Sequence, residues 1–83
     1  MNVRKLLRKA AASPANLRFG EFVTLVQGLG FRHSRTSGGH HIFVHPDVPV
    51  PANLQNVGGK AKPYQVRQVL KLVERYNLLA DAE

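Results

Sequence analysis

The sequence predicts a two-layer α+β domain, in which helices pack on one face of a three-stranded antiparallel sheet. Two observations predict this class. Apolar residues recur at helical spacing near both ends of the chain, whereas residues 31–55 are rich in β-forming residues separated by short turns. Because such turns are too short for a crossover, we expect neighbouring strands to be antiparallel. We expect residues 1–83 to form a single domain.

The first predicted element is a basic amphipathic helix within residues 1–13. Its apolar positions fall at i, i+3, i+4, i+7 and i+8, and they are Val3, Leu6, Leu7, Ala10 and Ala11. Lysine and arginine occupy the opposite face. Ser13-Pro14 ends the helix, because the residue before a proline is disfavoured in the helical region. We therefore expect an additional N-terminal helix in front of a core of residues 14–78.

Two further helices are predicted from their apolar stripes. The first stripe is Phe19, Phe22, Val23 and Val26, and it ends at Gly28 and Gly30. Gly30 stands where a left-handed residue commonly follows a helix. The second helix is expected to begin at Pro63, with the stripe Val66, Val69, Leu70 and Val73. We expect the chain to fray from Asn77 onward, so that residues 79–83 form a tail.

Three strands are expected between these helices, at residues 31–37, 40–45 and 48–54. Ser37-Gly38-Gly39 and Pro46-Asp47 predict the two turns. Pro49 and Pro51 have no N–H to donate, which places the third strand at a sheet edge. Residues 56–62 are expected to form a polar, glycine-rich loop. Without the first helix, the order is α-β-β-β-α, which is the order of the double-stranded-RNA-binding domain, although order alone does not establish function.

Charge and composition narrow the class of partner and the compartment. The chain has 12 Lys and Arg against 5 Asp and Glu, a formal charge of +7, and a pI near 10.6. Such a charge is expected of a protein that binds a phosphate backbone, although a solvated basic surface or an acidic protein partner would also account for it. There is no cysteine, and no apolar run has the length of a membrane span. We therefore expect a cytoplasmic protein.

Four histidines lie within thirteen residues, at positions 33, 40, 41 and 45. Any one of them alone is most simply a polar strand residue. His41 and His45 would share a strand face about 13 Å apart, too far to chelate one ion, so we expect neither a metal nor another cofactor. General acid–base catalysis remains, because imidazole exchanges protons near neutral pH. A histidine directly after Gly38-Gly39 would be open to an RNA backbone, since glycine has no Cβ.

The glycine turn and the strand after it resemble the HicA family of toxins. The similarity is carried by Leu29-Gly30-Phe31, by residues 38–46, by Asn53-Leu54-Gln55 with residues 59–68, and by residues 14–19. Together these segments span most of the chain from Pro14 to Leu78. The resemblance implies a double-stranded-RNA-binding-like fold and an endoribonuclease that cleaves mRNA without a known metal. It also implies a HicB-type antitoxin that neutralises the toxin.

The resemblance carries the family's catalytic histidine onto His40, the first residue after the turn. Gly39 departs from the family, in which serine is commoner at that position, and the adjacent His41 is the alternative. Alternation places His40 with Ile42 and Val44 on one face of the strand and His41 on the other. The periodicity does not decide which of the two faces meets the core.

The expected RNA-binding residues flank the turn or belong to the glycine-rich loop, and they are Arg32, Arg35, Gly38, Gly39, Lys60 and Lys62. Lys60 and Lys62 precede a helix start, where backbone N–H groups and the helix dipole favour phosphate. Each cation alone is more simply a solvated charge, whereas together they could form a track for RNA. A non-catalytic RNA-binding module is the alternative function, and a domain for an acidic protein partner is a third.

Overall fold

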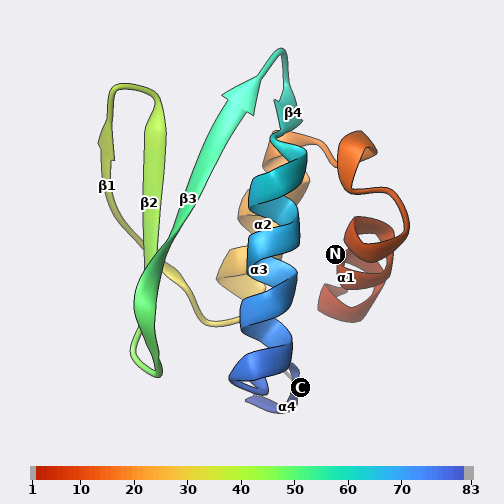
Figure 1. The fold of residues 1–83 in the computed structure, drawn as a ribbon, viewed down its shortest axis with the longest axis vertical. Coiled ribbons are helices and arrows are strands. Elements are labelled where there is room, and N and C mark those ends of the chain that lie inside the picture. The colour runs from red at the N-terminus through yellow and green to blue at the C-terminus, as the bar shows by residue number, and fades with distance from the viewer. Residues whose placement is uncertain (1, 82–83) are drawn as a thin grey trace.

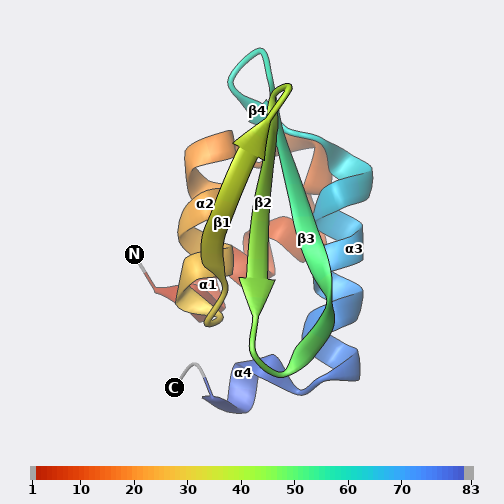
Figure 2. The ribbon, with the colours of Figure 1, turned by 90° about the vertical axis from the view of Figure 1, so that its left-hand side faces the viewer.

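The computed structural model describes residues 2–81 and has helices on one face of an antiparallel sheet (Figure 1). The predicted α+β class and the α-β-β-β-α order are confirmed. The elements in chain order are α1 (Val3–Ala12), the 3-10 turn η1 (Pro14–Asn16), α2 (Phe19–Gly28), β1 (Arg32–Ser37), β2 (His40–His45), β3 (Val48–Val57), β4 (Lys60–Ala61), α3 (Pro63–Arg75) and α4 (Leu78–Asp81). Figure 2 looks onto the open face of β1, β2 and β3, with the helices behind the sheet.

The sheet has four strands in the order β1-β2-β3-β4, one more than the sequence predicted. The prediction of a loop at residues 56–62 is wrong. β3 continues to Val57, and β4 (Lys60–Ala61) pairs with its end. Gly58 and Gly59 join the two strands with φ of +60° and +86°. Two consecutive residues with positive φ form a tight hairpin turn, for which a Gly-Gly pair is well suited.

β3 is irregular where its two prolines lie. His45 is opposite Val48, but Phe43 is opposite Ala52, so three residues of β3 lie across from Val44 alone. Pro49 and Pro51 are two of these three residues, and neither can donate to a ladder. Within β3, only Asn56 and Val57 pair with β4. The remainder of β3 is therefore a sheet edge, as the prolines predicted.

The helix-facing side of the sheet belongs to one hydrophobic core. Phe43, Ala52 and Leu54 are buried there, whereas Val44 on the opposite side is 41% exposed. α2 and α3 contribute their predicted apolar stripes to this core. α1 contributes as well, because Leu6 and Ala10 are fully buried. The basic N-terminal helix is thus packed into the same core as α2 and α3.

Gly30 joins α2 to β1 and makes room for a buried histidine. Its φ is +100°, the left-handed conformation that the sequence predicted. A Cβ at this position would lie 2.8 Å from Nε2 of His45. His45 is only 8% exposed, and its Nδ1 accepts a hydrogen bond from the Asp47 N–H at 3.0 Å. Its ring also packs against Phe31, so His45 has a structural role.

The segment after Asn77, which the sequence predicted to fray, contains a short helix. Asn77 has a φ of +51°, and the chain then forms the short helix α4. Leu78 is fully buried in the core, which holds this helix against the domain. Residues 82–83 of the predicted tail lie outside the described residues. Across residues 2–81, no helix combines the length and the apolar character needed to cross a membrane.

Candidate functional site

The open face of the sheet carries His40 and several of the polar residues around it. Residues directly opposite in an antiparallel pair project to the same side. His40 is opposite Ser37 on β1 and Gln55 on β3. Ile42, two residues further along the same face, is opposite Arg35 and Asn53. The pairing therefore places Arg35 and Asn53 diagonally across from His40, on the side that the helices leave uncovered (Figure 2).

A hydrogen bond joins His40 to the neighbouring strand. Nδ1 of His40 lies 3.0 Å from Oδ1 of Asn53, and both side chains are half-buried. Because an amide oxygen only accepts, the imidazole donates from Nδ1. Nε2 is then the nitrogen that can accept a proton from another molecule. The bond thus orients the ring and selects its tautomer.

His41 points to the opposite, helix-facing side, which settles the orientation that periodicity left open. Its ring centroid lies 5.0 Å from that of Phe19 at the start of α2. Its Nδ1 lies 3.2 Å from the Thr36 hydroxyl, and the same hydroxyl lies 2.8 Å from Nε2 of His33. The two adjacent histidines therefore have separate environments. His41 belongs to a chain of side chains along the β1 edge, and His40 belongs to the open face.

The structure brings some of the predicted RNA-binding residues to His40 and leaves others away from it. Arg32 and Arg35 are exposed on β1, opposite Val44 and Ile42, so both project to the face of His40. Gly38 and Gly39 form the turn before His40, with φ of +57° and +82°. A Cβ at either glycine would meet no atom within 4 Å. The turn is therefore open to a large ligand.

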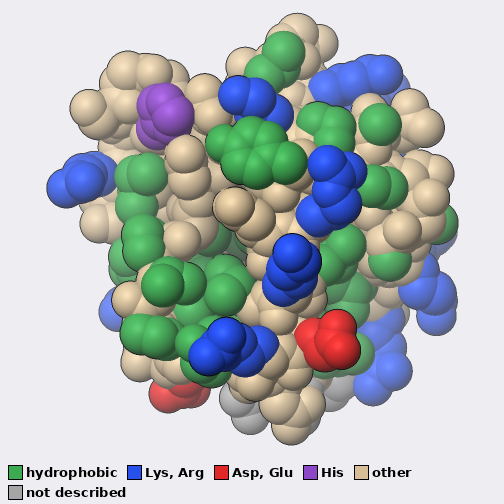
Figure 3. All heavy atoms as spheres, in the orientation of Figure 1, with side chains coloured by type: hydrophobic (Ala, Val, Ile, Leu, Met, Phe, Trp, Pro, Cys, Tyr) green, Lys and Arg blue, Asp and Glu red, His purple; other side chains and the backbone are tan. Residues whose placement is uncertain are grey.

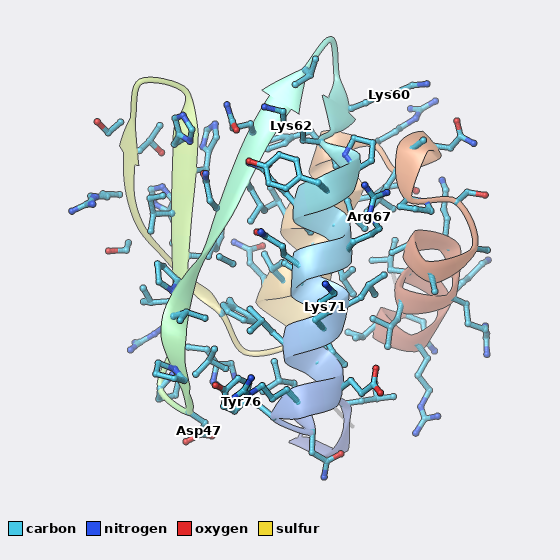
Figure 4. The ribbon with its side chains drawn as sticks, in the orientation of Figure 1. Asp47, Lys60, Lys62, Arg67, Lys71 and Tyr76 are labelled. Carbon is cyan, nitrogen blue, oxygen red and sulfur yellow. The ribbon has the colours of Figure 1, made fainter. Side chains whose placement is uncertain are left out.

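The two predicted lysines lie at the start of α3. Lys62 is its N-terminal capping residue, with Nζ 5.4 Å from the centre of the Tyr64 ring. Lys60 is in β4, opposite Val57 and bridged to Arg18. Figure 4 shows Lys60 extending away from β1 and β2, whereas Lys62 lies on the same face of the molecule as α3. Lys60 is thus directed away from the strand that carries His40.

A row of cations follows α3 and lies outside the predicted site. Arg67, Lys71 and Arg75 are exposed at four-residue spacing, which places them along one side of the helix. Figure 4 labels Arg67 and Lys71 of this row, and Figure 3 shows Lys and Arg side chains over α3. The helical spacing contains this signal. In the sequence these residues stand outside the apolar stripe, which by itself indicates only a solvent-facing side of the helix.

Asn53 is a residue of the site that the sequence did not predict. The sequence spacing between His40 and Asn53 does contain a signal that the two residues are close. A regular hairpin about the Pro46-Asp47 turn would place Asn53 directly opposite His40. The irregularity in β3 shifts the pairing by two residues, so that Gln55 is opposite and Asn53 is diagonal. The spacing along the strands therefore predicts that Asn53 lies near His40, but it does not predict the hydrogen bond between them.

The described residues do not offer a metal-binding cluster. Within residues 2–81, no three His, Asp or Glu side chains come close enough to share an ion. The chemistry that the open face can support with its own side chains is proton transfer at Nε2 of His40 and attraction of an anion by Arg32 and Arg35.

These features define a small basic α+β domain whose open sheet face presents an oriented imidazole, with two arginines of β1 on the same face. Residues 19–74 match the family model described as the HicA toxin of bacterial toxin–antitoxin systems. Because the match spans more than half of the chain, this chain belongs to the HicA toxin family, and membership implies an antitoxin partner. The match begins at the first residue of α2, so α1 lies outside it. No curated protein and no solved structure matches the chain.

Proposed function

We propose that this toxin is an endoribonuclease that cleaves mRNA without a metal ion, with His40 as the general acid–base group. The observation that carries the proposal is the Nδ1–Oδ1 hydrogen bond between His40 and Asn53, on a face that the helices leave open. It leaves Nε2 available, and Arg35 projects to the same face. Imidazole is suited to this role because it both accepts and donates protons near neutral pH.

The cleavage would use the ribose 2′-hydroxyl as the nucleophile. Nε2 of His40 accepts the proton of this hydroxyl, and the oxygen attacks the adjacent phosphorus. The O2′–P bond forms as the P–O5′ bond breaks, and a water molecule protonates the leaving O5′. The resulting hydroxide takes the proton from His40, so the imidazole returns to its neutral form. Arg35 would bind the phosphate, whose negative charge increases in the transition state, and Arg32, farther along the same face, would attract the adjoining RNA backbone. The Gly38-Gly39 turn would let the RNA backbone approach, since neither residue has a side chain.

The partner in this proposal is a HicB-type antitoxin that holds the nuclease inactive in the cytoplasm. The formal charge of +7 supports two parts of this proposal. It favours an RNA substrate, whose phosphates are anionic, and it favours an antitoxin with an acidic contact surface. Both partners would compete for the same basic surface.

The test compares wild type with His40→Ala and His41→Ala, by growth after induction and by incubation of the purified proteins with RNA in EDTA. His40→Ala should lose cleavage by about 10²–10⁴-fold, the usual contribution of a positioned general base. His41→Ala is the matched control and should retain it, because His41 lies on the opposite face. Undiminished cleavage by His40→Ala would remove His40 from the mechanism, and inhibition of wild type by EDTA would contradict metal independence.

The same experiment examines a second function, a non-catalytic RNA-binding module. The open, basic sheet face supports it, because binding alone does not need the His40–Asn53 arrangement. RNA that wild type shifts on a gel but leaves intact would favour this alternative. Absence of any RNA affinity at low salt, where phosphate contacts are strongest, would favour a domain for an acidic protein partner.

A further inference from the structure

A cleft of about 390 Å³ lies between the edge of β3 and α3. Val50 and Asn53 line it from the strand, and Gln68, Lys71 and Arg75 line it from the helix. We propose that this cleft binds a nucleotide of single-stranded RNA next to the one that is cleaved at His40. The inference rests on the proposed ribonuclease function and adds to it a second contact site for the substrate.

The cleft is continuous with the catalytic face through Asn53. The Asn53 side chain accepts the hydrogen bond from His40, and Asn53 is also one of the residues that line the cleft. An RNA strand that placed its 2′-hydroxyl at His40 would therefore have its next nucleotide at the edge of β3. The chain would cross that edge and enter the space beside α3.

The lining combines the chemistry of a base with that of a phosphate. Val50 is 47% exposed at the rim and offers apolar surface, and Gln68 offers an amide that can pair with a base edge. Lys71 and Arg75 supply positive charge. Among the described residues, neither the Gln68 side chain nor the Lys71 side chain has a hydrogen-bond or ion-pair partner. Figure 3 shows this face, with hydrophobic side chains on the β3 side and Lys and Arg along α3.

The size of the cleft fits a nucleotide rather than a duplex. Its volume lies near the lower end of the range for small-molecule sites, roughly 300–1,000 Å³. A base can enter such a space only when it is unpaired and turned out of a stack, which is how single-stranded RNA is commonly recognised.

The edge of β3 is poorly suited to the other common occupant, an added peptide strand. The Gln55 N–H points away from β2 and donates to Oε1 of Gln65 at 2.9 Å. By alternation, the backbone groups of Asn53 and Pro51 point to the same side. Pro51 has no N–H, so between residues 51 and 55 only Asn53 could donate to an incoming strand. Strand addition depends on a row of such donors, which is missing here.

The experiment measures the affinity of a fluorescent single-stranded RNA at one fixed salt concentration, using the full chain with His40→Ala so that the RNA stays intact. Lys71→Ala should weaken binding about tenfold, because it removes a charged contact to phosphate. Gln68→Ala should weaken it about threefold. Arg67→Ala is the matched control and should change it less than twofold, since Arg67 carries the same charge on the same helix but does not line the cleft.

A second measurement maps the contact directly. The same RNA carrying 4-thiouridine is irradiated on the protein, and the adducts are located by mass spectrometry. We expect adducts within residues 50–53 or 65–75. Adducts confined to other segments, or equal losses of affinity for Lys71→Ala and Arg67→Ala, would overturn the cleft proposal. Lys71→Ala that weakens the antitoxin complex but not RNA binding would also overturn it, and would assign the cleft to the protein partner.

The two proposals can fail separately. Cleavage by wild type in EDTA, with affinity unchanged in Lys71→Ala and Gln68→Ala, would leave the ribonuclease intact and remove the cleft. RNA that crosslinks in the cleft but is never cleaved by wild type would support the cleft as a binding site and contradict the ribonuclease function. Thermal unfolding of each variant, monitored by circular dichroism, excludes loss of the fold as the cause of weaker binding.

Discussion

His40 and His41 are neighbours in the chain but have different environments. The alternation of a strand sends their side chains to opposite faces, so His40 contacts Asn53 on the open side and His41 contacts Phe19 on the helix side. His45, four residues after His41, is buried against Gly30 and Phe31. The four histidines that are close in the sequence therefore have three separate roles. His40 is the candidate catalytic group, His33 and His41 are joined through Thr36 at the β1 edge, and His45 is a core residue.

At this scale we predict that Asn53 positions His40 rather than reacting itself. Asn53→Ala removes the acceptor for the Nδ1 proton, so the ring can rotate and change tautomer. We expect kcat to fall by about 10- to 100-fold with a smaller change in KM, since an orienting partner acts on the general base and not on substrate binding alone.

Asn53→Asp is the matched variant, because it keeps an acceptor oxygen at the same position. It should recover part of the lost kcat, and its pH–rate profile should move to higher pH, since a carboxylate stabilises the imidazolium. Equal kcat for wild type and Asn53→Ala would show that the hydrogen bond has no part in catalysis. RNA cleavage measured across pH provides both readouts.

At the scale of elements, the ends of helices and strands are held by particular side chains. Glu21 is in the first turn of α2 and accepts a hydrogen bond from the Arg18 N–H at 3.0 Å. The Lys9 ammonium on α1 donates to both oxygens of the same carboxylate, at 2.8 and 2.9 Å. Glu21 thus caps α2 and ties α1 to it. Gln65 acts comparably at the start of α3, where it bonds to the backbone and side chain of Gln55.

The pH dependence of stability follows from Glu21. The Lys9 hydrogen bonds, and then the Arg18 N–H, lower the pKa of Glu21 from its ordinary value of 4.5. A carboxyl whose pKa is lower in the folded state stabilises the fold above the unfolded pKa, and this contribution is lost as pH falls through the folded pKa. We expect Glu21→Gln to lower the free energy of unfolding by about 1 kcal/mol at pH 7. The deficit should shrink once the pH drops below 4.5.

Urea unfolding between pH 3 and pH 7 checks this prediction. Glu74→Gln is the control, because Glu74 is exposed and has no ion pair among the described residues. It should change stability by less than about 0.5 kcal/mol throughout. A deficit for Glu21→Gln that is the same at pH 3 and pH 7 would show that the ionised carboxylate does not contribute.

For the whole molecule, the main question is whether α1 folds together with the residues that match the HicA family. The match covers residues 19–74, and α1 precedes it. Even so, Leu6 is 1% exposed and Ala10 is fully buried in the common core. A small chain has few buried side chains, so the loss of any one of them is a large fraction of its stability. α1 is therefore expected to fold and unfold together with the rest.

Leu6→Ala tests this cooperation. We expect a loss of about 2–5 kcal/mol in the free energy of unfolding, the usual cost of truncating a buried leucine. Lys5→Ala, at the adjacent exposed position, should cost less than about 0.5 kcal/mol. Fluorescence of a tryptophan substituted for exposed Val57, a probe remote from α1, should report the same transition as circular dichroism. Separate transitions would show that α1 unfolds by itself.

The local order of the chain was predictable because it depends on local chemistry. Helical spacing located α1, α2 and α3, and Gly38-Gly39 and Pro46-Asp47 located two turns. The prediction of a polar, glycine-rich loop at residues 56–62 missed the β4 hairpin, although Gly58-Gly59 repeats the Gly-Gly pair that forms the turn at Gly38-Gly39. The buried position of Leu78 was missed because a short apolar segment has no periodicity of its own.

The sequence by itself determined the fold class, the element order and, through resemblance, the family that the comparison then showed. Only the tertiary structure decided which face of β2 meets the helices, that Asn53 bonds to His40, and that a cleft with Lys71 lies beside them. The physical reason is the range of the interactions. Propensity and turn chemistry act between near neighbours, whereas a sheet face is chosen by the burial of Phe43 and Leu54 against distant helices. The pairing that brings Asn53 to His40 depends in turn on the irregularity at Pro49 and Pro51.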